Sequence, residues 1–239
     1  MTLIVCLKGT NGMALVADSR GTFGDPRGVT AQNDNMQKLY SLSKHVGVLI
    51  AGSGEIGATV IQEISNILRE KPIDGVTPIM NEFRTMIIKK YSEWFRGFQI
   101  RQVQGNTNPV RPNLSIIIGG YEVDETGRAT EQKIYTLNSL NNFAPSLHDY
   151  GFALDGVPQY ALYLLNRIYN NGMDVDILVQ LGAYCVTETA SQDGKVGGPV
   201  KAMKISPDEG CDLLQTEEIN TVIELNNKRA EGLRRLFEG

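Results

Sequence analysis

The sequence predicts an α+β fold in which antiparallel sheets are covered by helices. Strand-like runs come in neighbouring pairs, helix-like stretches also come in pairs, and the two kinds follow each other in blocks along the chain. Single strands that alternate with single helices would instead indicate a parallel wound sheet. Because no internal repeat and no Gly/Ser-rich linker divides the chain, we expect one domain over residues 1–239.

Strands are expected where short apolar runs lie between turn signals. Residues 3–7 and 13–17 are joined through Asn11-Gly12, a strong hairpin signal, and both runs are apolar enough to be buried on two faces. Segment 24–28 contains two glycines and a proline and predicts a loop. The expected strands are residues 3–7, 13–17, 38–42, 46–51, 114–121, 133–137 and 197–205.

Helices are expected where apolar residues recur every three or four positions. Pro72 and Gly75 end the first helix, and Thr77-Pro78 begins the second. The polar segment 99–112 predicts a surface connection, and the acidic pair Glu217-Glu218 is expected to favour the start of the last helix. The expected helices are residues 55–69, 77–98, 158–169, 175–189 and 217–237.

The composition argues against several classes of protein. A net charge of −4 without a long Lys/Arg block argues against nucleic-acid binding, and no apolar run approaches about 18 residues, so no membrane partner is expected. Cys6, Cys185 and Cys211 are widely spaced, as is typical of reduced thiols in a cytoplasmic protein. His45 and His148 have no Cys or His nearby at metal-ligand spacing, so we expect neither a metal site nor a Ser-His triad. No glycine cluster matches a phosphate loop, and no cofactor is expected.

Thr2 is the first candidate for chemistry, because Met1 alone precedes it in this sequence. A threonine hydroxyl is a poor nucleophile until a base removes its proton. If Met1 is cleaved, Thr2 gains a free α-amine with an ordinary pKa of about 8, which suits it to act as that base. Taken alone, a threonine here fits the start of a strand equally well.

Five segments, in order along nearly the whole chain, carry a resemblance to a known family. They are residues 12–20 behind the threonine, 38–42, 48–52, 111–121 and 193–198. Together they resemble the proteasome β-type subunits and the bacterial and archaeal proteasome-like proteins, which are N-terminal-nucleophile (Ntn) hydrolases. The resemblance implies a four-layer αββα sandwich of two antiparallel sheets between helix layers, assembled into a homo-oligomeric ring.

The resemblance also implies a catalytic site made of six residues: Thr2, Asp18, Lys38, Gly52, Asp155 and Asp193. It assigns a direct role to the first four. Thr2 would supply the attacking hydroxyl and the α-amine base. Lys38 would lower the cost of the developing alkoxide, and Asp18 would hold the lysine, because a buried cation without a partner costs several kcal/mol. The backbone N–H of Gly52 would form the oxyanion hole.

Further residues match positions that line the substrate pocket in the family. Two glycines and apolar walls predict an open, uncharged pocket and a preference for a hydrophobic residue before the scissile bond. The matching residues are Gly21, Met36, Tyr40, Ile50 and Gly54.

The chain departs from the family pattern at three places. Residues 24–27 form an insertion of about four residues before Lys38. Val196, behind Asp193, stands where the family has a serine that donates a hydrogen bond near the catalytic amine, and valine cannot donate one. Asp155 stands in place of a second supporting serine, where its carboxylate could hold the Thr2 ammonium, although that would raise the pKa of the amine.

The leading interpretation is a cytoplasmic hydrolase, a threonine protease of the proteasome type that acts as an endopeptidase or amidohydrolase on peptides or unfolded proteins. The resemblance also admits an unfoldase partner. Two alternatives remain open. Val196 and Asp155 favour a catalytically inactive structural ring subunit, like the α-type relatives. A peptide ligase or transpeptidase would use the same acyl-enzyme and the same residues.

Overall fold

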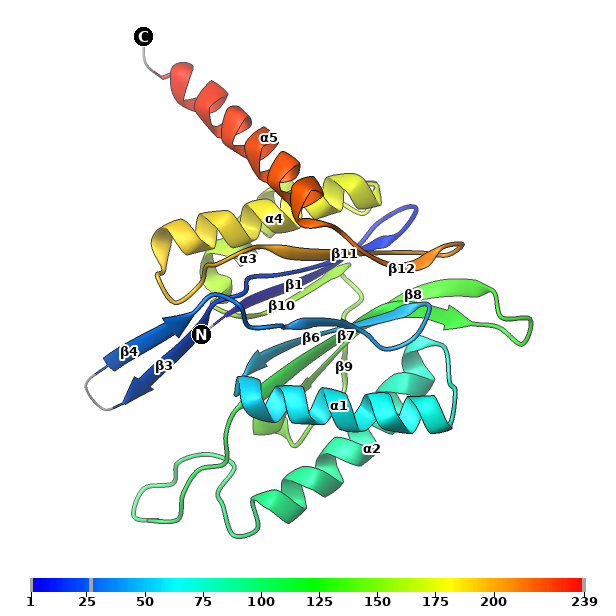
Figure 1. The fold of residues 1–239 in the computed structure, drawn as a ribbon, viewed down its shortest axis with the longest axis vertical. Helices are drawn as coiled ribbons and strands as arrows, with labels where there is room; N and C mark the ends of the chain where they lie inside the picture. The colour runs from blue at the N-terminus through cyan, green and yellow to red at the C-terminus, as the bar shows by residue number, and fades with distance from the viewer. Residues whose placement is uncertain (1, 26–27, 238–239) are drawn as a thin grey trace.

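Two antiparallel sheets pack face to face, and helices cover both outer faces (Figure 1). The structure is a computed structural model that describes residues 2–25 and 28–237. In this part of the chain each sheet has five strands, and a separate two-stranded ribbon extends from the side of the molecule. The predicted α+β class and the four-layer αββα arrangement are therefore confirmed.

The first sheet is built around the N-terminal hairpin. Its strands are β1 (Leu3–Lys8), β2 (Met13–Ala17), β10 (Phe152–Gly156), β11 (Lys201–Ser206) and β12 (Gly210–Leu213). They lie in the order β10-β1-β2-β11-β12, and all neighbours are antiparallel. The start of β1 is thus held between two other strands, with Leu3 opposite Gly156 on β10.

The second sheet continues from the next hairpin of the chain. Its strands are β5 (Leu39–Ser41), β6 (Val46–Gly52), β7 (Leu114–Val123), β8 (Ala129–Asn138) and β9 (Ser146–Leu147), in that order across the sheet. A short 3₁₀ helix (Ser139–Asn141) follows β8. Strand β6 ends at Gly52 and strand β7 begins at Leu114. The two residues are paired, so both lie at the same end of the strands of this sheet.

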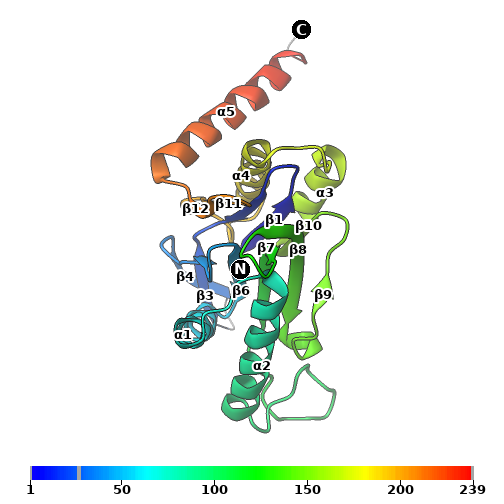
Figure 2. The same cartoon turned by 90° about the vertical axis from the view of Figure 1, so that its right-hand side faces the viewer.

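Five helices form the two outer layers of the described chain. α1 (Gly54–Glu70) and α2 (Val76–Trp94) cover the second sheet. α3 (Pro158–Ile168), α4 (Val175–Gln192) and α5 (Thr216–Arg235) lie on the side of the first sheet. Figure 2 shows that α5 leaves the body of the molecule toward the C-terminus. The predicted acidic helix start is present, because Gln215 and Glu218 form a capping box at α5.

The side chains of β1 alternate between two buried layers. Leu3, Val5 and Leu7 face the helices, whereas Ile4 and Cys6 face the second sheet. A strand buried on both faces contains only apolar residues, which is why the run at residues 3–7 could be identified in the sequence. The layer between the sheets also contains side chains from β2, β6, β7 and β11.

The structure differs from the expected elements mainly in exposed or short segments. Residues 24–28 were expected to be a loop, but β3 (Gly21–Asp25) and β4 (Gly28–Asn33) form a ribbon with a register shift at Phe23/Gly24. Pro26 and Arg27 of that expected loop lie outside the described residues. The ribbon has no alternating apolar pattern because its described residues are largely exposed, so the sequence carried no strand signal. The short strands β9, β10 and β12 were also not predicted.

Several predicted boundaries were wrong by three or four residues: β8 begins at Ala129 rather than at residue 133, and α4 ends at Gln192 rather than at residue 189. The second helix ends at Trp94 rather than near residue 98, because Phe95 has left the helical conformation and the chain turns through Gly97. The strand expected from residue 197 begins at Lys201, because Pro199 has no N–H to donate to a strand ladder. Within the described residues, no helix is both long and apolar enough to cross a membrane.

Gly156 is the position where the fold tolerates a side chain least. Its φ is +102°, and a Cβ built there would lie 1.8 Å from the carbonyl oxygen of Thr2. We expect Gly156→Ala to lower the free energy of unfolding by about 1–3 kcal/mol, since it adds backbone strain and a clash. Urea denaturation measures the change.

Gly232→Ala is the matched control for this prediction. Gly232 lies inside α5, and nothing lies within 4 Å of a Cβ built there. Alanine should therefore raise the free energy of unfolding by about 0.5–1 kcal/mol through helix propensity. Equal effects of the two substitutions would contradict the assignment of Gly156 as a close-approach position.

Candidate active site

A cavity of about 360 Å³ lies between the start of β1 and the end of the second sheet at which β6 ends and β7 begins. Seven residues expected from the sequence line it. They are Thr2, Gly21, Met36, Lys38, Ile50, Gly52 and Gly54. Side chains and backbone that are distant in the sequence are therefore brought to one site by the packing of the two sheets.

Thr2 immediately precedes β1 and is 4% exposed. Its carbonyl oxygen accepts a hydrogen bond from Val157 N at 2.8 Å, and Gly156 packs against the same carbonyl. Because side chains alternate along an extended chain, Thr2 lies on the same side of β1 as Ile4, which faces the second sheet. This position brings Thr2 to the cavity rather than to the helix layer.

Asp18, one residue beyond β2, is 1% exposed and accepts hydrogen bonds from several directions. Oδ1 accepts from Leu3 N at 3.0 Å and from Lys38 Nζ at 2.6 Å. Oδ2 accepts from Arg20 N at 3.2 Å and Gly197 N at 3.0 Å. A buried carboxylate needs such partners, because its desolvation alone costs several kcal/mol.

Lys38 lies one residue before β5 and is 8% exposed. Its Nζ donates to Asp18 Oδ1 at 2.6 Å and to the Arg20 carbonyl oxygen at 2.7 Å. Burial lowers the pKa of Lys38 below its usual value of 10.5, and the neighbouring Asp18 carboxylate opposes this shift. An ammonium has three donors, so one remains available toward the cavity that Lys38 lines.

Gly52 ends β6 and comes two residues before α1. Its φ of +102° and its approach to the Asn113 carbonyl, 2.4 Å from a Cβ built there, leave room for glycine only. Ser53 is the residue before the first turn of α1, where backbone N–H groups lack helical partners. The cavity is therefore flanked by the positive end of a helix dipole.

Asp155 does not line the cavity, although it lies on β10 opposite Ile4 of β1. Its carboxylate accepts hydrogen bonds from the Ser115 hydroxyl on β7 and from Gly156 N. These contacts connect the two sheets. The structure therefore shows a structural partner for Asp155 on the second sheet.

Asp193 and Val196 lie in the turn after α4. The Asp193 side chain accepts a hydrogen bond from Lys195 N at 2.9 Å, which stabilises the turn itself. Val196 is fully buried in the core between the first sheet and its helices. Of the turn residues, it is Gly197 whose backbone N–H reaches Asp18.

Tyr40 was expected to line the pocket but lies elsewhere. Side chains alternate along β5, so Leu39 faces the layer between the sheets and Tyr40 packs on the helix side of the second sheet. The Tyr40 hydroxyl donates to the Gln37 carbonyl at 2.9 Å. Tyr40 is therefore not among the described residues that form the cavity.

Sequence reasoning missed several residues that the cavity contains. Arg20 belongs to the motif that identified Asp18, so its position was available in the sequence, but nothing indicated a role for its side chain. The other missed lining residues are Thr22, Phe23, Gly24, Gln37, Ala51, Ser53, Glu55 and Leu114. Among the residues that the structure describes, no group of three His, Cys, Asp or Glu side chains is placed to hold a metal ion.

Comparisons with known proteins agree with this architecture. The family model described as "Proteasome subunit" matches residues 2–205. A Gly-1 mutant of Anbu from Hyphomicrobium sp. strain MC1 is similar at a TM-score of 0.73 and 16% sequence identity, covering 100% of this chain and 97% of that chain. Anbu from the same strain gives a TM-score of 0.72 at 16% identity, covering 99% and 97% of the two chains. A comparison with curated proteins returned no match.

The two kinds of comparison support different conclusions. At 16% identity the likeness to Anbu shows the fold alone. The family match extends over most of the chain, from the candidate nucleophile Thr2 to Ile205 in β11. The predicted resemblance is thereby confirmed, and the chain belongs to the proteasome subunit family.

Proposed function

We propose that the chain is a threonine-type endopeptidase in which Thr2 becomes the N-terminal nucleophile after removal of Met1. The observation that carries this proposal is that Thr2, Lys38 and Gly52 line one cavity, with Asp18 holding Lys38 at 2.6 Å. A nucleophile, a cation and a backbone donor at a helix start are the groups that acyl transfer from a peptide requires.

The proposed reaction begins when the Thr2 hydroxyl attacks the carbonyl carbon of the scissile peptide bond. The hydroxyl proton passes to the Thr2 α-amine, and the oxyanion is stabilised by the Gly52 N–H. Collapse of this intermediate breaks the C–N bond, and the leaving amine takes the proton from the Thr2 ammonium. Water, activated by the same amine, then attacks the acyl ester, releases the carboxylic acid and restores the threonine.

Lys38 assists this chemistry as an ammonium rather than as a base. Two of its donors are directed at the anionic Asp18 and at the Arg20 carbonyl, which is the arrangement of a protonated amine. The remaining donor and the positive charge favour an alkoxide forming on Thr2. Losing one donor of an oxyanion hole typically slows such reactions about 100- to 1000-fold, which is the scale of the contribution expected from the Gly52 N–H.

The substrate class follows from the walls of the cavity. Met36, Ile50 and Leu114 are apolar, and Gly21 and Gly54 leave space beside them. This supports a peptide or unfolded-protein substrate with a hydrophobic residue before the scissile bond. The products would be a peptide acid and a peptide amine, without a cofactor.

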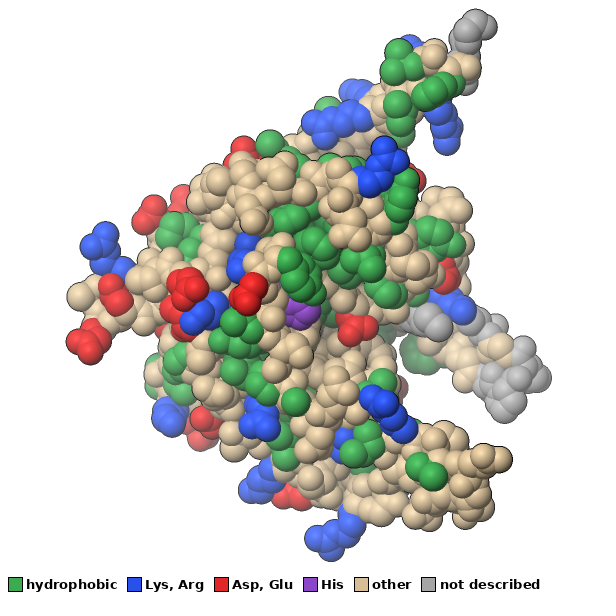
Figure 3. Space-filling view, turned by 180° about the vertical axis from the view of Figure 1, so that it is seen from behind, with side chains coloured by type: hydrophobic (Ala, Val, Ile, Leu, Met, Phe, Trp, Pro, Cys, Tyr) green, Lys and Arg blue, Asp and Glu red, His purple; other side chains and the backbone are tan. Residues whose placement is uncertain are grey.

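We further propose that the chain acts as a single domain in a cytoplasmic homo-oligomeric ring, with an unfoldase as a partner. Figure 3 shows hydrophobic side chains gathered in the middle of one face and on the projecting α5. Large exposed apolar residues of this kind often mark contacts between subunits. Those on α3 and α5 include Tyr160, Leu162, Tyr163, Leu225 and Leu233.

An inactive structural subunit remains the rival that specific observations favour. Val196 is buried in the core and supplies no hydrogen bond near Thr2. Asp155 is engaged by Ser115 and Gly156. The first two experiments below separate this alternative from the proposed peptidase.

Replacing Thr2 by alanine should abolish peptide hydrolysis, with kcat/KM falling at least about 1000-fold, because the nucleophile is removed. Thr85→Ala is the control, since Thr85 is an exposed α2 residue whose hydroxyl bonds Asn81 O of the same helix. Fluorogenic peptides with a hydrophobic residue before the cleaved bond provide the assay. Unchanged turnover in Thr2→Ala would exclude Thr2 as the nucleophile.

Activity should also depend on removal of Met1, because the Thr2 α-amine must be free to act as the base. We expect specific activity to be proportional to the fraction of chains that lack Met1, as measured by intact mass. Treatment of a mixed preparation with an aminopeptidase should raise both quantities together. Full activity from chains that quantitatively retain Met1 would refute the mechanism.

The rate should fall at alkaline pH because the Lys38 ammonium is lost there. Burial lowers the pKa of Lys38, so the cation is present below the lowered value and is lost as the pH rises through it. We therefore expect an alkaline limb in the pH profile of kcat below pH 10.5. Lys38→Arg, which stays charged, should be slower but should lose that limb. A wild-type profile that stays flat to pH 10.5 would speak against a protonated Lys38.

A further inference from the structure

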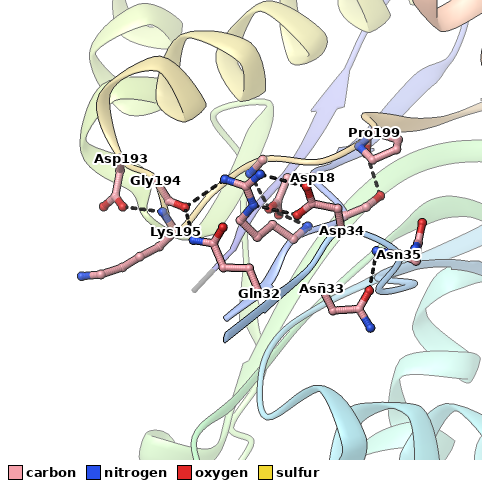
Figure 4. Close-up of polar contacts among 12 residues, drawn as sticks. Asp18, Gln32, Asn33, Asp34, Asn35, Asp193, Gly194, Lys195 and Pro199 are labelled. Atoms are coloured by element: carbon pink, nitrogen blue, oxygen red, sulfur yellow. Dashed lines mark hydrogen bonds and ion pairs between the residues drawn. The ribbon is translucent and has the colours of Figure 1, made fainter. Parts of the chain in front are cut away.

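The Arg20 side chain joins two loops that are far apart in the sequence. Figure 4 labels its partners in them, Asp34 and Gly194. Its Nε and Nη2 donate to the two carboxylate oxygens of Asp34, which follows β4, at 2.7 and 2.9 Å. Its Nη1 donates to the Gly194 carbonyl, in the turn after α4, at 3.0 Å. The guanidinium therefore holds the turn of residues 193–198 against the segment that leads to Lys38.

The same turn supplies one of the donors to Asp18. Gly197 N donates to Asp18 Oδ2 at 3.0 Å, and Ser19 N donates back to the Gly197 carbonyl. The Arg20 guanidinium also packs against Gly197, where a Cβ would lie 2.6 Å from Arg20 Cζ. Movement of Arg20 would thus loosen the turn that contacts the carboxylate holding Lys38.

We propose that the Arg20–Asp34 pair is a positioning clamp that fixes the 193–198 turn on Asp18 and thereby sets the position of Lys38. The proposal deepens the function inferred for the cavity and rests on it where turnover is concerned. Arg20 acts twice, because its own carbonyl oxygen accepts from Lys38 Nζ at 2.7 Å. Backbone and side chain of one residue therefore hold both the lysine and the turn.

The geometry requires an arginine at this position. Its planar fork satisfies both oxygens of Asp34 and still leaves a donor for Gly194. Lysine would offer a single nitrogen to the same partners. Gln32 Nε2 also donates to the Gly194 carbonyl at 3.0 Å, so the turn has a second, uncharged support.

A stabilising role alone does not account for this pair. The side chains of Arg20 and Asp34 are 22% and 43% exposed, and ion pairs that water can reach contribute little to stability. Variants of the pair should therefore remain folded. A displacement of about 1 Å in a catalytic group, by contrast, can cost about 100-fold in rate.

Arg20 and Asp34 carry opposite charges and therefore shift the pKa of Lys38 in opposite directions. The groups that shift the pKa of Lys38 are, besides burial, Asp18, Arg20 and Asp34; the Arg20 cation lowers it and the Asp34 carboxylate raises it. Arg20→Gln should therefore raise the pKa of Lys38, and Asp34→Asn should lower it. A general loosening of the fold would not produce shifts of opposite sign.

The test compares Arg20→Gln and Asp34→Asn with Lys90→Gln, which removes a matched ion pair to Glu63, 2.8 Å long, between α1 and α2. Hydrogen exchange of the Gly197 amide measures how firmly the turn is held on Asp18, and NMR titration of Lys38 measures its pKa. Neither measurement needs turnover. Peptide hydrolysis as a function of pH reports the consequence for the reaction. Thermal unfolding confirms that each variant is folded.

We expect faster exchange at Gly197 in both clamp variants, Lys38 shifts of opposite sign, and a fall in kcat of about tenfold or more, with Lys90→Gln unchanged. Unchanged exchange at Gly197, or Lys38 shifts of the same sign, would overturn the clamp. If the exchange and titration results hold but the wild-type protein hydrolyses no peptide, the clamp stands and the proposed peptidase function fails.

Discussion

The Asp18 carboxylate is the group on which the arrangement of the site depends. It is almost completely buried, and within the described chain it takes donors from β1, from its own loop, from Lys38 and from the turn after α4. Each donor offsets part of the cost of burying a charge, which amounts to several kcal/mol. Because the donors come from separate segments, satisfying one carboxylate brings the start of β1, the lysine and the turn together. The same interaction thus stabilises the fold and assembles the site.

The four-layer architecture explains why the site lies at the start of β1. Both faces of that strand are covered, so its side chains alternate between the helix layer and the layer between the sheets. The Thr2 side chain faces the layer between the sheets, at the place where β6 ends and α1 begins. The close approach of Gly156 to the Thr2 carbonyl fixes the position of Thr2 relative to β10. A residue at the end of a buried strand is therefore rigidly held yet open to a cavity, as the role proposed for Thr2 requires.

The sequence allowed prediction of the strands that are buried on both faces and of the residues that belong to a local motif. Runs such as residues 13–17 and 114–121 identify themselves because they are apolar on both faces, and Asp18 was identifiable from its motif. The ribbon at residues 21–33 was not predictable, because exposed strands carry no apolar alternation. The pairing of Arg20 with Asp34 was equally hidden, since it arises only when that ribbon folds back. Tyr40 was misplaced for a related reason: strand register, which local sequence does not specify, decides which face a side chain takes.

The charges around the cavity favour an anion that develops during a reaction over one that arrives with the substrate. Lys38 and the start of α1 are positive, but Asp18 already neutralises Lys38, and Glu55 lies in the first turn of the helix. Arg20 lines the cavity as well, yet both oxygens of Asp34 occupy its guanidinium. A negatively charged substrate would therefore find no unpaired cation among these groups. In the proposed reaction, a new oxyanion would instead meet the Gly52 N–H, and an alkoxide on Thr2 would meet the remaining Lys38 donor. Both donors are oriented before the reaction begins. Preorganised dipoles of this kind stabilise a transition state without attracting a charged ground state.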